Sequence, residues 1–271
     1  MDHTPPEHYH LNATFNHVGG NLPIDNTDID AIMKVLARQH DLISEEFTEM
    51  VEKGINVRNL KEVRDGLGDV LVTVDGLYYR LGLEYPRVAL WGDFRDFNYT
   101  DGVYGIDEGL ILLKQIISGK VTQETASRLL HVIKVSADSI VHGVYLLAHH
   151  WGVDLAADQR AIVASNMSKF DTDEDVAIEG ITKYAELEVK SELVPNTVDG
   201  VVYHVIRCTE STKGKDGKTY SIGKILKSVN FHEPHLEELV DDHPLHLFAF
   251  DTFERDENGS YLRVARKPIE A

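Results

Sequence analysis

Hydrophobic residues recur every three or four positions through two stretches in the first third of the chain, 29–54 and 60–81. This spacing predicts two amphipathic α-helices. Asn26-Thr27-Asp28 supplies an N-cap before the first helix, Gly54 marks its end, and Asn59 can cap the second. Because the connector between the helices is short, we expect them to form an antiparallel pair.

Helical spacing returns in 110–117 and 123–151. The segment 85–107 before it is rich in aromatic, Gly and Asp residues, and we expect a long loop there. The later helices resemble the first pair at an offset of seventy positions. The apolar pairs at this offset are Val70 and Ile140, Val74 and Val144, and Leu77 and Leu147. We interpret the match as a degenerate duplication of a helical hairpin, which gives a four-helix-type bundle; the alternative is chance similarity between two amphipathic helices.

The composition changes after residue 170, where β-type segments and turn residues replace the helical pattern. One surface helix is expected in 171–188, capped by Asp171 or Thr172. The expected strands are 201–207 and 220–226, joined by the turn 213–217, and then a hairpin of 246–250 and 261–265 around 256–259. The sequence therefore predicts a mainly α protein, with a helical core in 1–170 and a small α+β appendage in 171–271.

Composition and charge exclude several classes of protein. The 271-residue chain has a formal net charge of −18, which argues against binding nucleic acid through its phosphates. A nucleotide substrate is still compatible with this charge if divalent cations lie between the two sets of negative groups. No stretch approaches the roughly 20 apolar residues of a membrane helix, and the N-terminus lacks the features of a signal peptide. The single cysteine, Cys208, fits a reducing cytosol, so we expect a cytoplasmic protein.

Each helix of the first pair carries a stripe of carboxylates beside its apolar face. The acidic residues are Glu45, Glu46, Glu49, Glu62, Asp65 and Asp69. Residues three or four apart lie on one side of a helix, so pairing the apolar faces brings the two acidic edges near each other. Carboxylates that face a common space repel one another unless cations occupy it. Ligand sets made only of oxygen select hard ions such as Mg²⁺ or Mn²⁺, so the pattern predicts a divalent metal site.

Solvated helix faces are the alternative explanation of these acids. Glu62 and Asp65, near a helix N-terminus, also gain from the helix dipole without any metal. Asp69 lies too deep in its helix for that effect. Gly66 and Gly68 beside it each cost about 1 kcal/mol in a helix, which indicates that a ligand or another backbone comes close. The positions seventy residues after these acids carry no carboxylate, so we expect one metal cluster per chain.

Three motifs occur in order along the chain. Glu45-Glu46-x-x-Glu49 is followed by Asp65-Gly-Leu-Gly-Asp69, then by the segments 164–170 (ASNMSKF) and 223–234 (GKILKSVNFHEP). The acidic motif resembles the signature of the all-α nucleoside triphosphate pyrophosphohydrolases, which comprise MazG, the dimeric dUTPases and phosphoribosyl-ATP pyrophosphohydrolase. The two later segments are similar to segments of phage MazG-like and dCTP pyrophosphatase proteins. The resemblance spans roughly residues 9–239, and the order of the motifs makes it fairly specific.

This resemblance implies Mg²⁺-dependent hydrolysis of dCTP, dUTP or both to a nucleoside monophosphate and pyrophosphate, with Mn²⁺ as a substitute metal. It implies that the six carboxylates supply the metal ligands, with Glu46 or Glu49 as the catalytic base. It also implies substrate-binding roles for Asn166, Lys169, Lys224, Lys227 and Asn230. A homodimer is expected, located in the host cytoplasm if the protein is encoded by a phage.

The ligand set and the base specificity stay open. Glu62-x-x-Asp65 has the spacing of the family's ExxD element, whereas Asp69 has its Leu-Gly-Asp context and leaves Gly66 where the family has Glu. The alternatives are a MazG-like enzyme of other base specificity, and a non-catalytic nucleotide-binding or interaction protein. A di-iron bundle needs Glu-x-x-His pairs within its helices, and Glu7-x-x-His10 follows two prolines outside the predicted helices.

Overall fold

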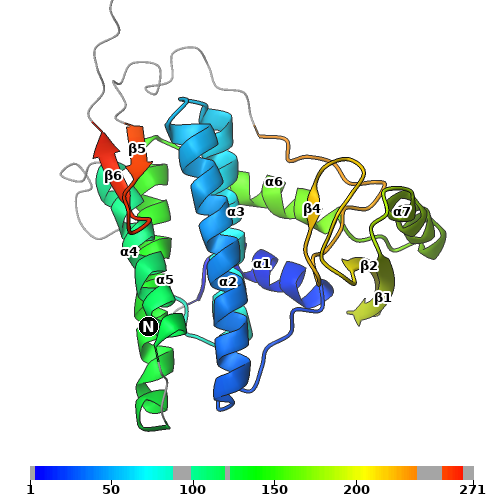
Figure 1. The fold of residues 1–271 in the computed structure, drawn as a ribbon, viewed down its shortest axis with the longest axis horizontal. Coiled ribbons are helices and arrows are strands. Elements are labelled where there is room, and N and C mark those ends of the chain that lie inside the picture. Colours follow the sequence, from blue (N-terminus) through cyan, green and yellow to red (C-terminus); the bar gives the residue numbers. More distant parts are fainter. Residues whose placement is uncertain (1–3, 88–98, 120–122, 237–251, 265–271) are drawn as a thin grey trace, which may run out of the picture. The chain divides into compact units, whose positions relative to one another are not determined.

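A computed structural model describes residues 4–87, 99–119, 123–236 and 252–264 of the chain, and these are mostly helical (Figure 1). The fold class predicted from the sequence, mainly α with a smaller strand-containing region toward the C-terminus, is confirmed. The helices are α1 Glu7–Val18, α2 Ile29–Glu49, the π-helical segment η1 Met50–Ile55, α3 Leu60–Leu81, α4 Tyr99–Ser118, α5 Gln123–His150, α6 Leu155–Met167 and α7 Glu174–Glu186.

The chain divides into two compact units. Unit 1 consists of Met1–His10, Pro23–Gln159 and Leu236–Ala271, and unit 2 consists of Leu11–Leu22 and Arg160–His235. Helices α1 and α6 each contribute residues to both units. This grouping rests on compactness, and the sequence-based division at residue 170 stays a prediction.

Unit 1 is built from the long helices α2, α3, α4 and α5. Helix α2 packs against α3 and α4, and α5 packs against α3 and α4. The predicted caps at the start of the first pair are confirmed. The Asp28 carboxylate accepts a hydrogen bond from the Ala31 N–H, and the Asn59 side chain accepts one from the Glu62 N–H. Gly82 ends α3 with a φ of 61°, a left-handed conformation that favours glycine.

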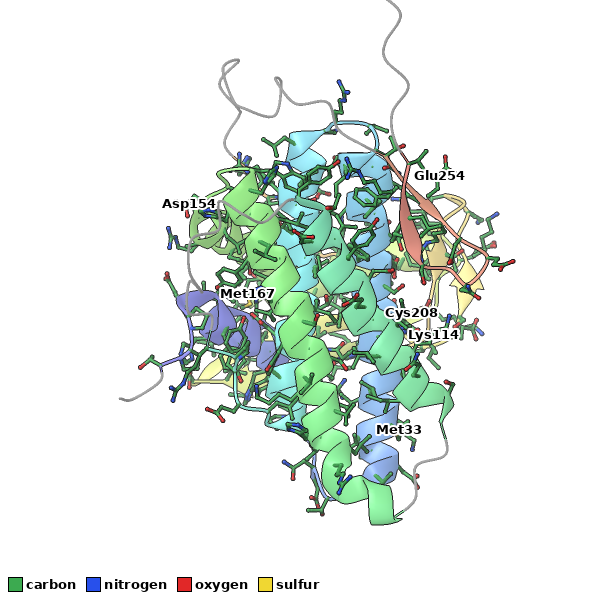
Figure 2. All side chains as sticks on the ribbon, turned by 90° about the vertical axis from the view of Figure 1, so that its left-hand side faces the viewer. Met33, Lys114, Asp154, Met167, Cys208 and Glu254 are labelled. Carbon is green, nitrogen blue, oxygen red and sulfur yellow. The ribbon has the colours of Figure 1, made fainter. Side chains whose placement is uncertain are left out.

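Helices α4 and α5 approach each other closely because glycines line their contact. The two helices run side by side along their length in Figure 2, with side chains filling the space between them and their neighbours. A Cβ on Gly143 would lie 2.6 Å from the Gly102 carbonyl oxygen, and a Cβ on Gly109 would lie 2.5 Å from Ile140 Cγ1. The sequence prediction of a loop over 85–107 is therefore wrong for its last part, since these glycines serve helix packing within α4. The part at 88–98 lies outside the described residues.

Helix α2 passes directly into the π-helical segment η1, so the chain stays helical to residue 55. Gly54 lies within η1 and packs against α3, where a Cβ would meet Val63 Cγ2 at 2.8 Å. The glycine predicted to end the helix instead permits close packing at its last turn. Helices α1 and α6 are absent from the sequence-based expectation, and α1 includes Glu7 and His10.

The described strands pair as antiparallel hairpins. Strand β1 Ser191–Val198 pairs with β2 Val201–Cys208, β3 Thr212–Lys213 pairs with β4 Thr219–Tyr220, and β5 Thr252–Arg255 pairs with β6 Tyr261–Val264. The expected strand at 201–207 is confirmed, but its partner is β1 because Asp199 and Gly200 form a tight turn with positive φ. In the expected strand 220–226, Tyr220 belongs to β4, and the end of the segment joins β2 through an isolated bridge from Ile225 to Arg207 and through backbone hydrogen bonds to Ile206 and Cys208. The expected strand at 246–250 lies outside the described residues.

The helix expected in 171–188 forms, with a different cap, and α5 is unusually long and apolar. Helix α7 starts at Glu174 and is capped by Asp173, not by Asp171 or Thr172. Residues Arg128–His150 of α5 are long and apolar enough to cross a membrane by length and composition. Core helices of soluble proteins pass the same test, and this helix packs against α3 and α4.

Candidate functional site

The three acids of α2 lie near its C-terminal end. Glu46 is half-buried, whereas Glu45 and Glu49 are exposed. Glu46 and Glu49 are three residues apart and so share one side of the helix, which is the relationship expected from the sequence. Glu49 is the last residue of α2, immediately before η1.

The three acids of α3 lie in the first half of that helix. Glu62, Asp65 and Asp69 are all half-buried. Their spacing of three and four residues places them along one side of α3, and α3 packs against both α2 and η1. The structure therefore brings together the two helices that carry the predicted metal ligands.

Lys53 on η1 interacts with acids of α2 and α3. Its Nζ lies 2.7 Å from Glu49 Oε2. The hydrogen bond to Glu49 raises the pKa of Lys53, and the charges of Glu62 and Glu46 raise it further. Lys53 thus pairs with one acid of α2, and the charge of one acid of α3 also acts on it. The sequence carried a signal for this contact, because Glu49 and Lys53 have the i,i+4 spacing of a helical ion pair.

Gly66 explains how α3 comes so close to the end of α2. A Cβ at this position would lie 2.4 Å from Met50 Cβ, a distance that real side chains do not reach. Of the two causes considered for the glycines beside Asp69, close approach of another element accounts for Gly66. The glycine therefore allows α3 to pack tightly against the segment that directly follows the acids of α2.

Two residues in the first turns of α6 contact α3 close to its acidic residues. Arg64 forms an ion pair with Asp158, with Arg64 Nε 2.8 Å from Asp158 Oδ2 and Asp158 almost fully buried. Gln159 Nε2 donates to the Gly68 carbonyl oxygen at 2.8 Å. Sequence reasoning missed both residues, since nothing in the spacing links α6 to α3. These contacts hold the α3 segment that carries Asp65 and Asp69.

The acids do not form a ready-made coordination shell. Within the residues that the structure describes, no group of three or more His, Cys, Asp or Glu side chains is arranged to hold a metal ion. Their donor chemistry and their placement on adjoining helices fit a hard divalent cation. Binding one requires the exposed side chains of this group to change rotamer, with Lys53 giving up its bond to Glu49.

In unit 2, the two later motifs meet. The Ser165 hydroxyl donates to the His232 carbonyl oxygen at 2.8 Å, and the His232 N–H donates to the Ser168 hydroxyl at 3.2 Å. Residues 164–170 and 223–234 are thus joined by reciprocal hydrogen bonds between their backbones and side chains. This convergence of two distant motifs is what a shared binding role requires.

The polar residues of these motifs differ in exposure. Asn166 is buried on α6 and accepts a hydrogen bond from Lys169 Nζ at 2.5 Å. Lys227 is exposed, with its Nζ 3.0 Å from Glu233 Oε1 and 3.8 Å from the centre of the Phe231 ring. The remaining two predicted substrate ligands are exposed, namely Lys224 and Asn230. Lys224, Lys227 and Asn230 are therefore accessible to an anionic ligand, whereas Lys169 is half-buried and Asn166 is buried.

A separate buried network lies in unit 1. His8 Nδ1 is 2.9 Å from Asp75 Oδ2, and His8 Nε2 is 2.8 Å from the Tyr145 hydroxyl. Burial, with the charge of Asp75, raises the pKa of Tyr145. The network ties the first turn of α1 to α3 and α5, and we assign it a structural role.

Comparison with known proteins gives one relative. The chain is 26% identical over 258 residues to a protein of Acanthamoeba polyphaga mimivirus named "Uncharacterized protein L479", covering 85% of this chain and 93% of that protein. No protein-family model matches the chain, and no solved structure matches it. The relative shows that nearly the whole chain has a viral counterpart of similar extent.

Proposed function

We propose that the protein is a Mg²⁺-dependent nucleoside triphosphate pyrophosphohydrolase acting on dCTP, dUTP or both. The observation that carries the proposal is the tight contact between α3 and the segment that follows α2, where Gly66 lies against Met50. This contact brings the helix of Glu62, Asp65 and Asp69 against the end of the helix that carries Glu45, Glu46 and Glu49. In the same segment, Lys53 Nζ lies 2.7 Å from Glu49 Oε2.

The chemistry of these acids supports a metal role. All six candidate ligands are oxygen donors, and Mg²⁺ binds through a few carboxylates together with substrate phosphates. When bound, the metal neutralises phosphate charge and lowers the pKa of a coordinated water. The half-buried Glu46, Glu62, Asp65 and Asp69 are partly shielded from bulk water, which strengthens their attraction for a cation.

Different residues of the chain have different roles in the proposed reaction. Glu46 or Glu49 accepts the proton of the attacking water. The oxygen of that water forms a new bond to phosphorus as the bridge between the α and β phosphates breaks, and pyrophosphate leaves. Lys169, Lys224 and Lys227 offer ammonium groups to phosphate oxygens, and Asn166 and Asn230 offer an amide to the sugar, phosphate or base.

The helical core is proposed to derive from a duplicated hairpin. Shifting α2 and α3 by seventy residues places them on 99–119 and 130–151, which nearly coincide with α4 and the main part of α5. Gly82 and Gly152 occupy the same place in the two copies and have φ values of 61° and 64°. The same capping bond follows in both, from the Leu83 N–H to Tyr78 and from the Val153 N–H to Ala148. These matches favour duplication over chance similarity.

One observation favours the non-catalytic alternative. In the described part of the chain the acids are not arranged as a metal-binding group. A binding protein that has lost turnover keeps the fold and the motif contacts without needing such a group. Homodimer formation and a location in the host cytoplasm remain proposals that follow from the resemblance.

Product analysis separates these functions. The protein is incubated with each deoxynucleoside triphosphate and Mg²⁺, and the nucleotide products are resolved by ion-exchange chromatography. The proposal expects a nucleoside monophosphate and pyrophosphate in equal amounts from dCTP or dUTP, and no product when EDTA removes the metal. Release of inorganic phosphate in place of pyrophosphate, or no product from any nucleotide, contradicts it.

A further inference from the structure

Asp171 lies directly after the motif 164–170, and its side chain contacts the other motif of unit 2. Asp171 is 6% exposed, and its Oδ1 accepts a hydrogen bond from the Ser228 hydroxyl at 2.7 Å. Ser228 is 1% exposed and lies between Lys227 and Asn230, two of the predicted substrate ligands. One buried hydrogen bond therefore joins the end of the first motif to the centre of the second.

Ser228 connects Asp171 to the backbone of the turn 227–230. Its hydroxyl donates to Asp171 and accepts a hydrogen bond from the Asn230 N–H at 2.9 Å. The Tyr184 hydroxyl of α7 holds the preceding residue, accepting from the Lys227 N–H at 3.0 Å and donating to the Lys227 carbonyl oxygen at 3.1 Å. The turn 227–230 is thus fixed from its buried side, while the side chains of Lys227 and Asn230 stay exposed.

The buried position of the Asp171 carboxylate does not by itself stabilise the fold. Its backbone exchanges two hydrogen bonds with His204 of β2, so the two side chains stand on the same face. Among the described residues, Asp171 Oδ2 and His204 Nδ1 are buried without a hydrogen-bond partner. Burying a carboxylate oxygen in this way costs stability. A carboxylate at this buried position is explained by its Oδ1, which accepts the hydrogen bond from the Ser228 hydroxyl.

We propose that Asp171 is a positioning residue, which acts through Ser228 to hold the turn 227–230 in the shape that presents Lys227 and Asn230 to a nucleotide phosphate. The inference rests on the proposed function for its ligand, and on the hydrogen bonds above for its mechanism. It assigns to Asp171 and Ser228 a role in ligand affinity, with no contact to the reacting atoms.

The test compares four variants of the full chain. Ser228→Ala deletes the bridging hydroxyl, and Asp171→Leu deletes the acceptor at similar volume. Asp171→Asn keeps an acceptor oxygen for Ser228, and Asp199→Asn removes a carboxylate from the exposed β1–β2 turn as a control. Hydrogen–deuterium exchange is measured on peptides covering 227–233, and binding of α,β-imido-dCTP with Mg²⁺ is measured by calorimetry.

We expect exchange in 227–233 to accelerate on the order of tenfold in Ser228→Ala, as expected from the loss of one hydrogen bond. The Kd for the analogue rises in parallel, and Asp171→Asn and Asp199→Asn stay close to wild type in both measurements. If Asp171→Leu does not fold, Ser228→Ala alone tests whether the Asp171–Ser228 hydrogen bond holds the turn. Unchanged exchange in Ser228→Ala, or faster exchange with unchanged affinity, overturns the inference. Failure of the wild-type protein to bind the analogue overturns the proposed function, while the exchange comparison still shows whether Asp171 and Ser228 hold the turn.

Discussion

Arg64 of α3 and Asp158 of α6 form a buried ion pair in which both guanidinium contacts are short. Arg64 Nε lies 2.8 Å from Asp158 Oδ2, and a terminal nitrogen lies 2.5 Å from Oδ1. Asp158 is 2% exposed and Arg64 is 11% exposed. Two parallel bonds of this kind fix the orientation of both groups. The pair thereby holds α3 about one and a half turns before Asp69.

Removing Asp158 deletes two charge-assisted hydrogen bonds of the largely buried Arg64. We expect Asp158→Ala to lower the free energy of unfolding by about 3–5 kcal/mol. The matched control is Glu210→Ala, which removes a partner of the exposed Lys190–Glu210 pair and costs about 0–1 kcal/mol. Urea denaturation followed by circular dichroism measures both. Equal effects of the two substitutions contradict the role given to the buried pair.

Gly66 is required by packing and not by a ligand. An added Cβ would lie 2.4 Å from Met50 Cβ, so Gly66→Ala forces α3 and η1 apart. The expected cost is about 1–3 kcal/mol of overpacking, which exceeds the gain of about 1 kcal/mol in helix propensity. Gly105→Ala is the control, because its nearest neighbours lie at 3.6 Å and the substitution is expected to be neutral or stabilising. Thermal denaturation of both variants checks the sign of each effect.

At the proposed metal site, Lys53 is expected to compete with the cation for Glu49. Lys53→Met removes one positive charge beside Glu49, so Mg²⁺ or Mn²⁺ affinity is expected to rise about tenfold, as for a divalent ion and a unit charge roughly 6 Å apart in water. Titration calorimetry with Mn²⁺ measures the change. The control is Lys114→Met, which removes an equivalent exposed charge from α4 (Figure 2). If both variants bind Mn²⁺ alike, Lys53 does not lie within the metal site.

Asp107 gives the protein a predictable pH dependence. Burial raises the pKa of this carboxyl, although the Tyr261 N–H donates to its Oδ2 at 3.1 Å. A raised folded-state pKa means that the folded protein binds the proton more tightly than the unfolded chain does. The resulting stabilisation is full below the unfolded pKa and is lost as pH rises through the folded pKa.

Asp107→Asn should therefore stabilise the protein at pH 7 and lose this advantage at pH values below the unfolded pKa of about 3.9. Urea midpoints measured across this range check the prediction, with Glu179→Gln on the exposed face of α7 as the control. A stability difference between Asp107→Asn and wild type that is independent of pH contradicts the proposed cause.

The sequence predicts those parts of the fold that depend on local chemistry. Asp28 and Asn59 were found as caps because their side chains satisfy helix N–H groups within three residues. Helix α4 was largely missed since its glycines, which suggest a loop in isolation, are required by α5. The identity of β1 as the partner of β2 was missed for a similar reason, because Pro195 within it disfavours a strand assignment.

The candidate site also contains residues that local spacing predicts and residues that only the tertiary fold brings together. The acidic residues of α2 and α3 have the helical spacing that the sequence predicts, and their role as metal ligands stays a prediction. Lys53 was within reach of the same reasoning through its i,i+4 relation to Glu49. Asp171 and Ser228 were not, because they are 57 residues apart and meet only through the fold of unit 2.

We propose that the acids of α2 and α3 support metal-dependent cleavage between the α and β phosphates. This proposal is tested by ³¹P NMR of dCTP and dUTP with Mg²⁺, comparing wild type with Glu49→Gln and with Asp41→Asn at an exposed position of the same helix. Pyrophosphate is expected from wild type and Asp41→Asn, and no turnover is expected from a folded Glu49→Gln. Wild-type turnover by Glu49→Gln, or no pyrophosphate from the wild-type protein, contradicts it.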